Sequence, residues 1–157
     1  MKQDKKHNST LDSNGRFLLP ASVLREWSVN MEDGFVINRS SDKCLTLYPM
    51  KIWNKYKEEL NKLNAFDPKV RRLIRFFTGG STEVKPDAKG RLLIPQHLQE
   101  YAKLRKELYI TKINFLVEIW NPELYEAENA NFAEDYQDFI SETSKQIFGD
   151  GSAFTIS

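Results

Sequence analysis

Apolar and polar positions along the chain follow one pattern twice. The first copy reads Leu11-Asp12-Ser13-Asn14-Gly15-Arg16-Phe17-Leu18-Leu19-Pro20, and the second reads Pro86-Asp87-Ala88-Lys89-Gly90-Arg91-Leu92-Leu93-Ile94-Pro95. In each copy, the segment Asp-x-x-Gly-Arg is followed by three apolar residues and a proline. The two copies lie 75 residues apart. A repeat of this length that occurs only once more indicates a duplicated half-domain and not a solenoid.

The polar part of each copy predicts a β-hairpin turn. Asp12 and Asp87 stand at the first turn position, where a carboxylate can accept backbone N–H groups two residues on. Gly15 and Gly90 stand at the fourth position, where glycine tolerates a left-handed backbone. The apolar runs 17–19 and 92–94 do not alternate with polar residues. We therefore predict core strands that are covered on both faces.

The pattern after each turn extends the repeat. Pro20 and Pro95 suit the first turn of a short helix, and apolar residues at helical spacing predict helices over 21–27 and 96–102. Apolar segments typical of strands follow at 35–37, 45–48, 108–110 and 115–120. Each half thus predicts the order β-β-α-β-β. The fold class that follows is α+β and mainly β.

Three longer helices are predicted outside the two repeats. Two lie between the halves, over 49–63 and 67–77, and the third spans 122–148. The cations Lys69, Arg71, Arg72 and Arg75 on the second helix indicate either a solvated face or contact with nucleic acid. The last helix has an apolar stripe for docking, on its own body or on a neighbouring subunit. The stripe contains Phe132, Tyr136, Phe139, Ile140 and Ile147.

These elements predict four segments along the 157 residues. Residues 6–52 form the first repeat domain, 53–80 a helical connector, 81–124 the second repeat domain, and 125–157 an acidic C-terminal helix and tail.

Charge is distributed unevenly along the chain, although the net charge is only +1. Residues 121–157 contain eight acidic side chains against the single cation Lys145, which leaves a net +8 for the first 120 residues. Such a basic body with an acidic tail fits a protein that meets a polyanion on one side only. Two differently solvated surfaces would explain the same distribution.

Several classes of protein are disfavoured by what the sequence contains. No apolar run of about 18 residues occurs and the charged start lacks an apolar run, so we expect no membrane span or signal peptide and a cytoplasmic location. Cys44 is the only cysteine, which excludes an internal disulfide, and we expect it half-buried in a strand. His7, expected in a frayed terminus, and His97 have no partnered nucleophile. We therefore predict no enzyme activity, cofactor, metal site or small-molecule substrate.

The motifs resemble those of the MraZ family of bacterial transcriptional regulators, which carry two copies of the half-barrel of SpoVT and AbrB-type DNA-binding proteins. The resemblance covers about residues 8–125, in five blocks that occur in the family's order. These blocks are Leu11-Asp12-x-x-Gly15-Arg16; Leu45-x-Leu47-Tyr48-Pro49 with Trp53; Thr78-Gly79-Gly80-Ser81-x-Glu83; Asp87-x-Lys89-Gly90-Arg91-Leu92-Leu93-Ile94-Pro95; and Val117-Glu118-Ile119-Trp120-Asn121.

The resemblance implies a duplicated swapped-hairpin β-barrel that assembles into a homo-oligomeric ring and acts at the nucleoid. Its implied partner is double-stranded promoter DNA, as G-rich direct repeats upstream of the division and cell-wall gene cluster. It assigns Arg16 and Arg91 to DNA contact, with Lys89 as the basic turn residue beside Arg91. Two features depart from the family. Asn14 replaces the first turn cation and can donate hydrogen bonds without a charge, and 2–7 replace the usual opening strand.

Other roles for these residues stay open at this stage. Arg16 and Arg91 could instead be exposed cations that anchor the turns through Asp12 and Asp87, while the aspartates and Gly15 and Gly90 shape the turns. At the level of the whole protein, the alternative is an antitoxin-like module that uses the same barrel to bind a protein. An arginine fork matches O6 and N7 of guanine, which favours the DNA hypothesis.

Overall fold

The two repeats form the elements that the pattern predicts, in the same order. The computed structural model describes residues 7–148. The first repeat contains β1 (Asn8–Thr10), β2 (Arg16–Phe17), α1 (Ala21–Glu26), β3 (Phe35–Arg39) and β4 (Leu45–Pro49). The second contains β5 (Thr82–Val84), β6 (Leu92–Leu93), α4 (Gln96–Tyr101), β7 (Glu107–Ile113) and β8 (Leu116–Trp120). Only the first repeat has an additional 3-10 helix among the described residues, η2 (Met31–Asp33), which follows an Asn30 cap.

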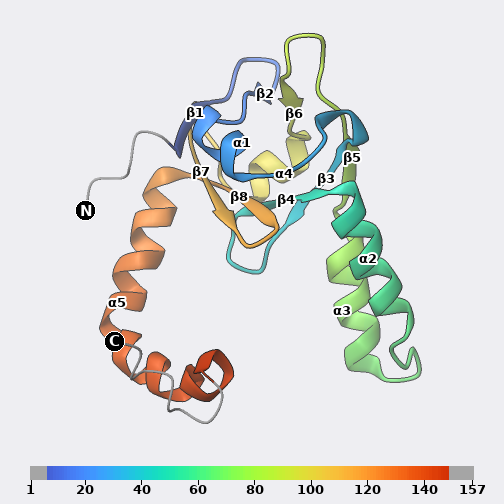
Figure 1. Ribbon diagram of the computed structural model, residues 1–157, viewed down its shortest axis with the longest axis vertical. Coiled ribbons are helices and arrows are strands. Elements are labelled where there is room, and N and C mark those ends of the chain that lie inside the picture. The colour runs from blue at the N-terminus through green and yellow to red at the C-terminus, as the bar shows by residue number, and fades with distance from the viewer. Residues whose placement is uncertain (1–6, 149–157) are drawn as a thin grey trace. The chain divides into compact units, whose positions relative to one another are not determined.

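Strands from the two repeats are interleaved within shared sheets (Figure 1). The larger sheet is antiparallel and has the order β1-β7-β8-β4-β3-β5. Its edge strand β1 pairs with β7 of the second repeat, and its other edge strand β5 pairs with β3 of the first. The smaller sheet joins β2 to β6, with Arg16 opposite Leu93. Each repeat therefore completes its sheets with strands from the other.

The core draws equally on both repeats. Phe17, Val23 and Phe35 from the first are almost fully buried, as are Leu98 and Ile110 from the second. Trp27, just after α1, stacks on Phe35 with ring centroids 5.2 Å apart, and its indole N–H donates to the Phe115 carbonyl at 3.0 Å. Burial of apolar surface stabilises such a core by about 25 cal/mol per Å². One common core thus holds the repeats together.

The prediction for the apolar runs after the turns was wrong in one respect. Leu18 is 52% exposed and Leu93 is 43% exposed, whereas their neighbours on both sides are buried. The β2–β6 ribbon therefore has one face in the core and one in solvent, because no layer of the described chain packs over its outer face. These runs are buried on alternate residues, although all their residues are apolar.

The connector is a helical hairpin made of α2 (Met50–Asn61) and α3 (Pro68–Gly79), which lie side by side (Figure 1). Asp67 caps α3 by accepting the Lys69 N–H at 2.9 Å. Trp53 of α2 stacks on Phe77 of α3, with ring centroids 4.7 Å apart. The Asn38 side-chain amide donates to the Phe77 carbonyl, which ties the connector to β3. Both helix bounds agree with the prediction within two residues.

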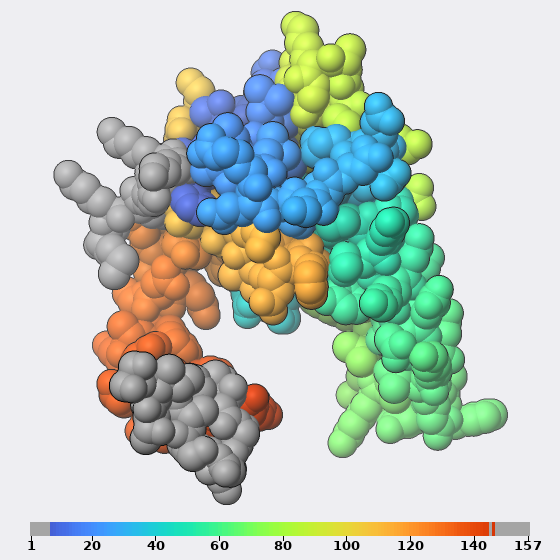
Figure 2. Space-filling model, in the orientation of Figure 1, coloured from blue at the N-terminus to red at the C-terminus, as the bar shows by residue number. Residues whose placement is uncertain are grey.

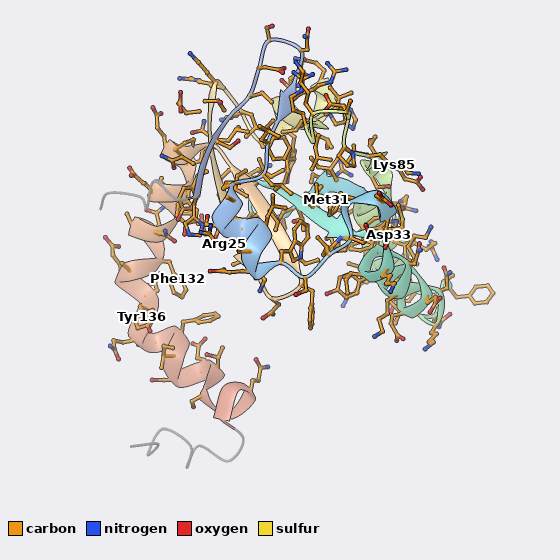
Figure 3. The ribbon with its side chains drawn as sticks, turned by 45° about the horizontal axis from the view of Figure 1, so that its top comes forward. Arg25, Met31, Asp33, Lys85, Phe132 and Tyr136 are labelled. Atoms are coloured by element: carbon orange, nitrogen blue, oxygen red, sulfur yellow. The ribbon has the colours of Figure 1, made fainter. Side chains whose placement is uncertain are left out.

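The helix α5 (Pro122–Phe148) has the predicted bounds. One compact unit of the chain ends at Pro122, and a second begins at Glu123. Within α5, Phe132 contacts Tyr136 and Phe139, with ring centroids 5.9 and 5.2 Å apart. Figure 3 shows Phe132 and Tyr136 on one side of this helix. Ile140 is half-buried, and the side chain of Ile147 lies outside the described part.

The class α+β holds, but the expectation of a mainly β chain is wrong. More of residues 7–148 lie in helices than in strands. The cause is that α2, α3 and α5 add long helices, while β2 and β6 are only two residues long. Within the described range, no helix is long and apolar enough to cross a lipid bilayer.

Candidate functional site

The two Asp-x-x-Gly-Arg turns have the same backbone hydrogen bonds. Asp12 Oδ1 accepts the N–H groups of Asn14 and Arg16, both at 2.9 Å. Asp87 Oδ1 accepts those of Lys89 and Arg91, also at 2.9 Å. In each turn the aspartate N–H also donates to the arginine carbonyl, and the glycine N–H donates to the aspartate carbonyl. Each carboxylate therefore holds its own turn closed.

The turn glycines have identical backbone conformations but different surroundings. Gly15 and Gly90 both have φ of +81°, where a β-carbon is strained. A β-carbon at Gly15 would lie 2.7 Å from Gln99 Nε2, whereas at Gly90 the nearest atom, Leu18 Cδ2, is 3.8 Å away. The first turn is thus packed against α4, and the second is open.

The β2–β6 pairing brings both turns to the same end of the molecule's first unit. Figure 1 shows the two loops next to each other above β2 and β6, and Figure 2 shows the second turn as a protruding tip beside the first. The Ile94 N–H, just after β6, donates to the Gly15 carbonyl at 2.8 Å, which ties the first turn to the second repeat. Residues 75 positions apart therefore form one surface.

The two arginines share a cluster with the two turn aspartates. Arg91 Nε donates to Asp87 Oδ2 at 2.9 Å, and Arg91 Nη1 donates to Asp12 Oδ2 at 3.4 Å. Arg16 Nε lies 3.9 Å from Asp87 Oδ2. The side chains of Arg16 and Arg91 are 36% and 33% exposed. Both guanidinium groups are held against the turns and still reach solvent.

The electrostatics of the cluster keep both carboxylates ionised. The pKa of Asp12 lies below its usual value, mainly because its carboxylate accepts the Arg16 backbone N–H. The pKa of Asp87 is lowered mainly by the Arg91 backbone N–H and further by the Arg91 side chain. Hydrogen bonds to the charged form favour that form. At neutral pH the cluster therefore pairs two cations with two anions.

Lys89 and Asn14 occupy equivalent exposed positions, each directly before the turn glycine. Their backbone N–H groups bind the aspartates, and their side chains are exposed. The exposed Leu18, directly after β2, and Leu93, on β6, belong to the same surface. Sequence reasoning missed both leucines, because an unbroken apolar run carries no signal for an exposed position.

Outside this surface, the residues considered for enzyme chemistry have structural surroundings. His7 Nδ1 lies 2.9 Å from the Ile110 carbonyl oxygen and its ring stacks on Tyr109, so the expectation of a frayed position was wrong. His97 Nε2 lies 3.4 Å from the Gly80 carbonyl oxygen. Cys44 is fully and not half-buried, just before β4, and burial raises its pKa. In the range 7–148, no cluster of three or more His, Cys, Asp or Glu side chains could hold a metal.

The interleaved sheets and the twin turns define a class of duplicated α+β proteins, in which each repeat contributes one turn to a common surface. Comparison with known proteins gives the particular family. A family model described as "MraZ protein, putative antitoxin-like" matches residues 5–76 and again residues 77–147. The chain belongs to the MraZ family.

Individual relatives agree with this assignment. A protein of Flavobacterium psychrophilum is 36% identical over 141 residues, which are 89% of this chain and 90% of the relative. One from Christiangramia forsetii is 38% identical over 84% of this chain and 86% of its own length. A third, from Halothermothrix orenii, is 36% identical over 87% of this chain and 91% of its own length. All three are named transcriptional regulator MraZ.

Proposed function

We propose that this chain is a sequence-specific DNA-binding transcriptional regulator, and that the twin-turn surface contacts the DNA. The relatives' shared name supports regulation of transcription. The observation that carries the site is the Arg91 ion pair with the aspartates of both turns, which, together with the approach of Arg16 to Asp87, holds the two arginines in one cluster. A preorganised guanidinium loses less entropy when it binds a base edge.

The proposed roles follow from side-chain chemistry. Arg16 and Arg91 read guanine O6 and N7 in the major groove, where a bidentate arginine discriminates by about 1–3 kcal/mol. Lys89 pairs with a phosphate, and Asn14 donates a neutral hydrogen bond. Asp12, Gly15, Asp87 and Gly90 act indirectly, by fixing where these side chains stand. The aspartates also repel phosphate, which keeps the arginines directed at bases.

One pair of turns makes too few base contacts to give the specificity that a regulator needs. Specific sites are bound about 4–10 kcal/mol better than random DNA. We therefore propose that several copies act together as a homo-oligomeric ring on G-rich direct repeats, upstream of the division and cell-wall genes, at the nucleoid. Linked copies gain affinity through effective concentration. The exchange of edge strands between 6–52 and 81–124 supports a swapped-hairpin barrel as the unit of this ring.

The first test is removal of one turn arginine. Arg91→Ala should weaken binding to DNA from upstream of the protein's own gene by about tenfold to a hundredfold, because it deletes one base reader. Fluorescence anisotropy at fixed salt measures the affinity. Arg25→Ala, which removes an exposed guanidinium from α1, is the matched control and should leave affinity unchanged.

Equal affinity of Arg91→Ala and the wild-type protein, with both folded by circular dichroism, would contradict the proposed site. Arg16→Ala, measured beside it, shows whether the turn that carries Asn14 also contacts DNA.

The exposed Leu18 and Leu93 favour a second candidate, an antitoxin-like module that binds a protein on the same surface. Exposed apolar side chains with a polar rim are typical of protein interfaces. A Leu18→Ser and Leu93→Ser double variant separates the two candidates. Full DNA affinity in this variant favours the regulator, and loss of a protein partner captured by the wild type favours the module.

A further inference from the structure

Two oppositely charged helical surfaces lie on separate parts of the chain. The helical hairpin of α2 and α3, residues 50–79, has eight cations and three anions, a net charge of +5. The helix α5 has seven anions and one cation, a net charge of −6. Both surfaces also expose large apolar side chains, which isolated solvated helices rarely do in groups. The pair therefore has the charge and the apolar area of an interface.

The exposed stripe on α3 combines both properties. Lys69, Arg72, Leu73 and Phe76 follow the spacing i, i+3, i+4, i+7, which puts them on one helix face. All four are exposed. Phe76 is held in place by the Arg39 guanidinium, 4.5 Å above its ring. We call these four residues the α3 stripe.

The helix α5 has a matching stripe with the opposite charge. Phe132, Asp135, Tyr136 and Phe139 repeat the same spacing, and Glu128 extends the face by one turn. The Phe132 ring contacts both Tyr136 and Phe139, which groups the three rings on this face. We call these five residues the α5 stripe. The α3 stripe thus has two cations and two apolar side chains, and the α5 stripe has two anions and three aromatic rings.

The connector and α5 leave the sheet from two adjacent strands, at different points. The strands β4 and β8 are antiparallel neighbours, with Leu45 opposite Ile119 and Leu47 opposite Val117. The connector begins after the end of β4, and α5 begins after the end of β8. These two helical segments therefore start from opposite ends of adjacent strands. When two different surfaces bind each other in successive copies, the contact is head-to-tail, and it closes into a ring when the rotation allows it.

We propose that the α5 stripe of one copy docks on the α3 stripe of the next copy. This inference rests on the proposed function, whose ring it supplies with an interface. The α5 stripe is negatively charged and repels DNA, which excludes DNA as its occupant. For the α3 stripe, a second copy offers both opposite charge and aromatic rings, whereas a phosphate backbone offers only the charge.

The test exchanges the charges of the two stripes in full-length protein. Lys69→Glu with Arg72→Glu makes the α3 stripe acidic, and Glu128→Lys with Asp135→Lys makes the α5 stripe basic. Each double variant alone should self-associate at least about tenfold more weakly than the wild type, by sedimentation, because like charges then face each other. An equimolar mixture should recover the wild-type mass, because the exchanged stripes are complementary.

A matched control and an apolar variant complete the design. Arg25→Glu with Arg105→Glu makes the same change of charge as the α3 variant, but at exposed sites outside both stripes. It should leave the mass unchanged. Leu73→Ser should weaken association without changing any charge. Circular dichroism shows that each variant is folded.

An unchanged mass in both charge variants would overturn the inference. A mixture that stays dissociated would also overturn it. That second result is expected if α5 docks within its own chain. A monomeric wild type would also overturn it. DNA binding separates this inference from the proposed function. If the wild type forms oligomers and binds its upstream DNA while both variants stay oligomeric, only the stripe contact is wrong. If the mixture recovers its mass but no DNA binds, the regulator proposal is wrong and the contact stands.

Discussion

At the scale of residues, Asp12 and Asp87 each hold two kinds of partner. Oδ1 binds the backbone of its own turn, and Oδ2 binds the Arg91 side chain. The proposed DNA reader and the turn are therefore supported by the same carboxylates. A change at either aspartate should affect stability and DNA binding together.

Ionisation of Asp87 should make stability depend on pH. Because its folded pKa is below the usual 3.8, the charged carboxylate contributes stability that is present above about pH 4 and is lost as pH falls through the folded pKa. Asp87→Asn should therefore lower the urea midpoint at pH 7, and the difference from the wild type should narrow below pH 3.8. Unfolding curves at pH 7, 5 and 3 measure this.

Asp138→Asn, at an exposed position on α5, makes the same chemical change outside the turns and is the control at pH 7, where it should leave the urea midpoint unchanged. A constant difference between Asp87→Asn and the wild type at all three pH values would contradict the role given to Asp87.

The two turn glycines provide a matched pair of substitutions. Alanine at either position is strained by about 1–2 kcal/mol, because φ is +81°. Gly15→Ala should cost more than Gly90→Ala, since its β-carbon would displace Gln99, which donates to the Ile94 carbonyl at 2.7 Å. Urea unfolding measures both. Adding Gln99→Ala to Gly15→Ala should remove the clash, and equal costs at the two glycines would refute the packing argument.

Residue types in the turns were predictable, but their partners were not. The sequence indicates that Asp12 and Asp87 each accept N–H groups of their own turn, because that hydrogen bond is local. The contact from Arg91 to Asp12 joins residues 79 positions apart. It depends on β2 pairing with β6, and no local pattern encodes which strands pair.

At the scale of elements, helices were predicted well because their ends carry local signals. Asp67 caps α3, Pro68 follows at its start, and Pro122 begins α5. Strands were harder. The short edge strand β1 has a polar sequence, Asn-Ser-Thr, and forms because β7 offers it backbone partners. Tertiary context, and not propensity, decides such a strand.

The connector should depend on the Trp53 ring. Trp53 is almost fully buried, between Phe77 and Tyr48. Trp53→Ala should cost about 3–5 kcal/mol of unfolding free energy, because a large cavity forms between α2 and α3. Tyr56→Ala, one turn further along α2 and exposed, should cost less. Thermal unfolding of both variants measures the costs, and equal effects would contradict the cavity argument.

At the scale of the whole molecule, the duplication was evident in the sequence and the exchange of strands was not. The same hydrophobic pattern is compatible with two repeats that form separate sheets and with two repeats that share their sheets. Only the resemblance to MraZ implied an exchange. The structure shows β1 on β7 and β5 on β3. The fold could therefore be predicted to the level of the repeat, and the site to the level of the single turn.

Salt dependence should separate the proposed roles of the cations. If the assembly neutralises several phosphates, log affinity falls with log salt by about 0.9 per phosphate. Lys89→Ala should lower that slope by about one for each phosphate that is no longer neutralised, while Arg91→Ala should lower affinity with little change in slope. Anisotropy titrations over a range of salt concentrations measure both slopes. A flat response in the wild type would contradict phosphate binding altogether.

The exchanged edge strands also constrain how the protein is made. When the ribosome has released only the first repeat, β1 has no strand to join, because its partner β7 begins at Glu107. The edge of β1 that pairs with β7, and the edge of β4 that pairs with β8, stay unpaired until β7 and β8 have emerged. The sheet is therefore completed late in translation. Distant pairings of this kind slow folding. A stop codon between the two repeats would thus give a chain with an incomplete sheet. Its unpaired edge strands would favour aggregation, and the first repeat would not function alone.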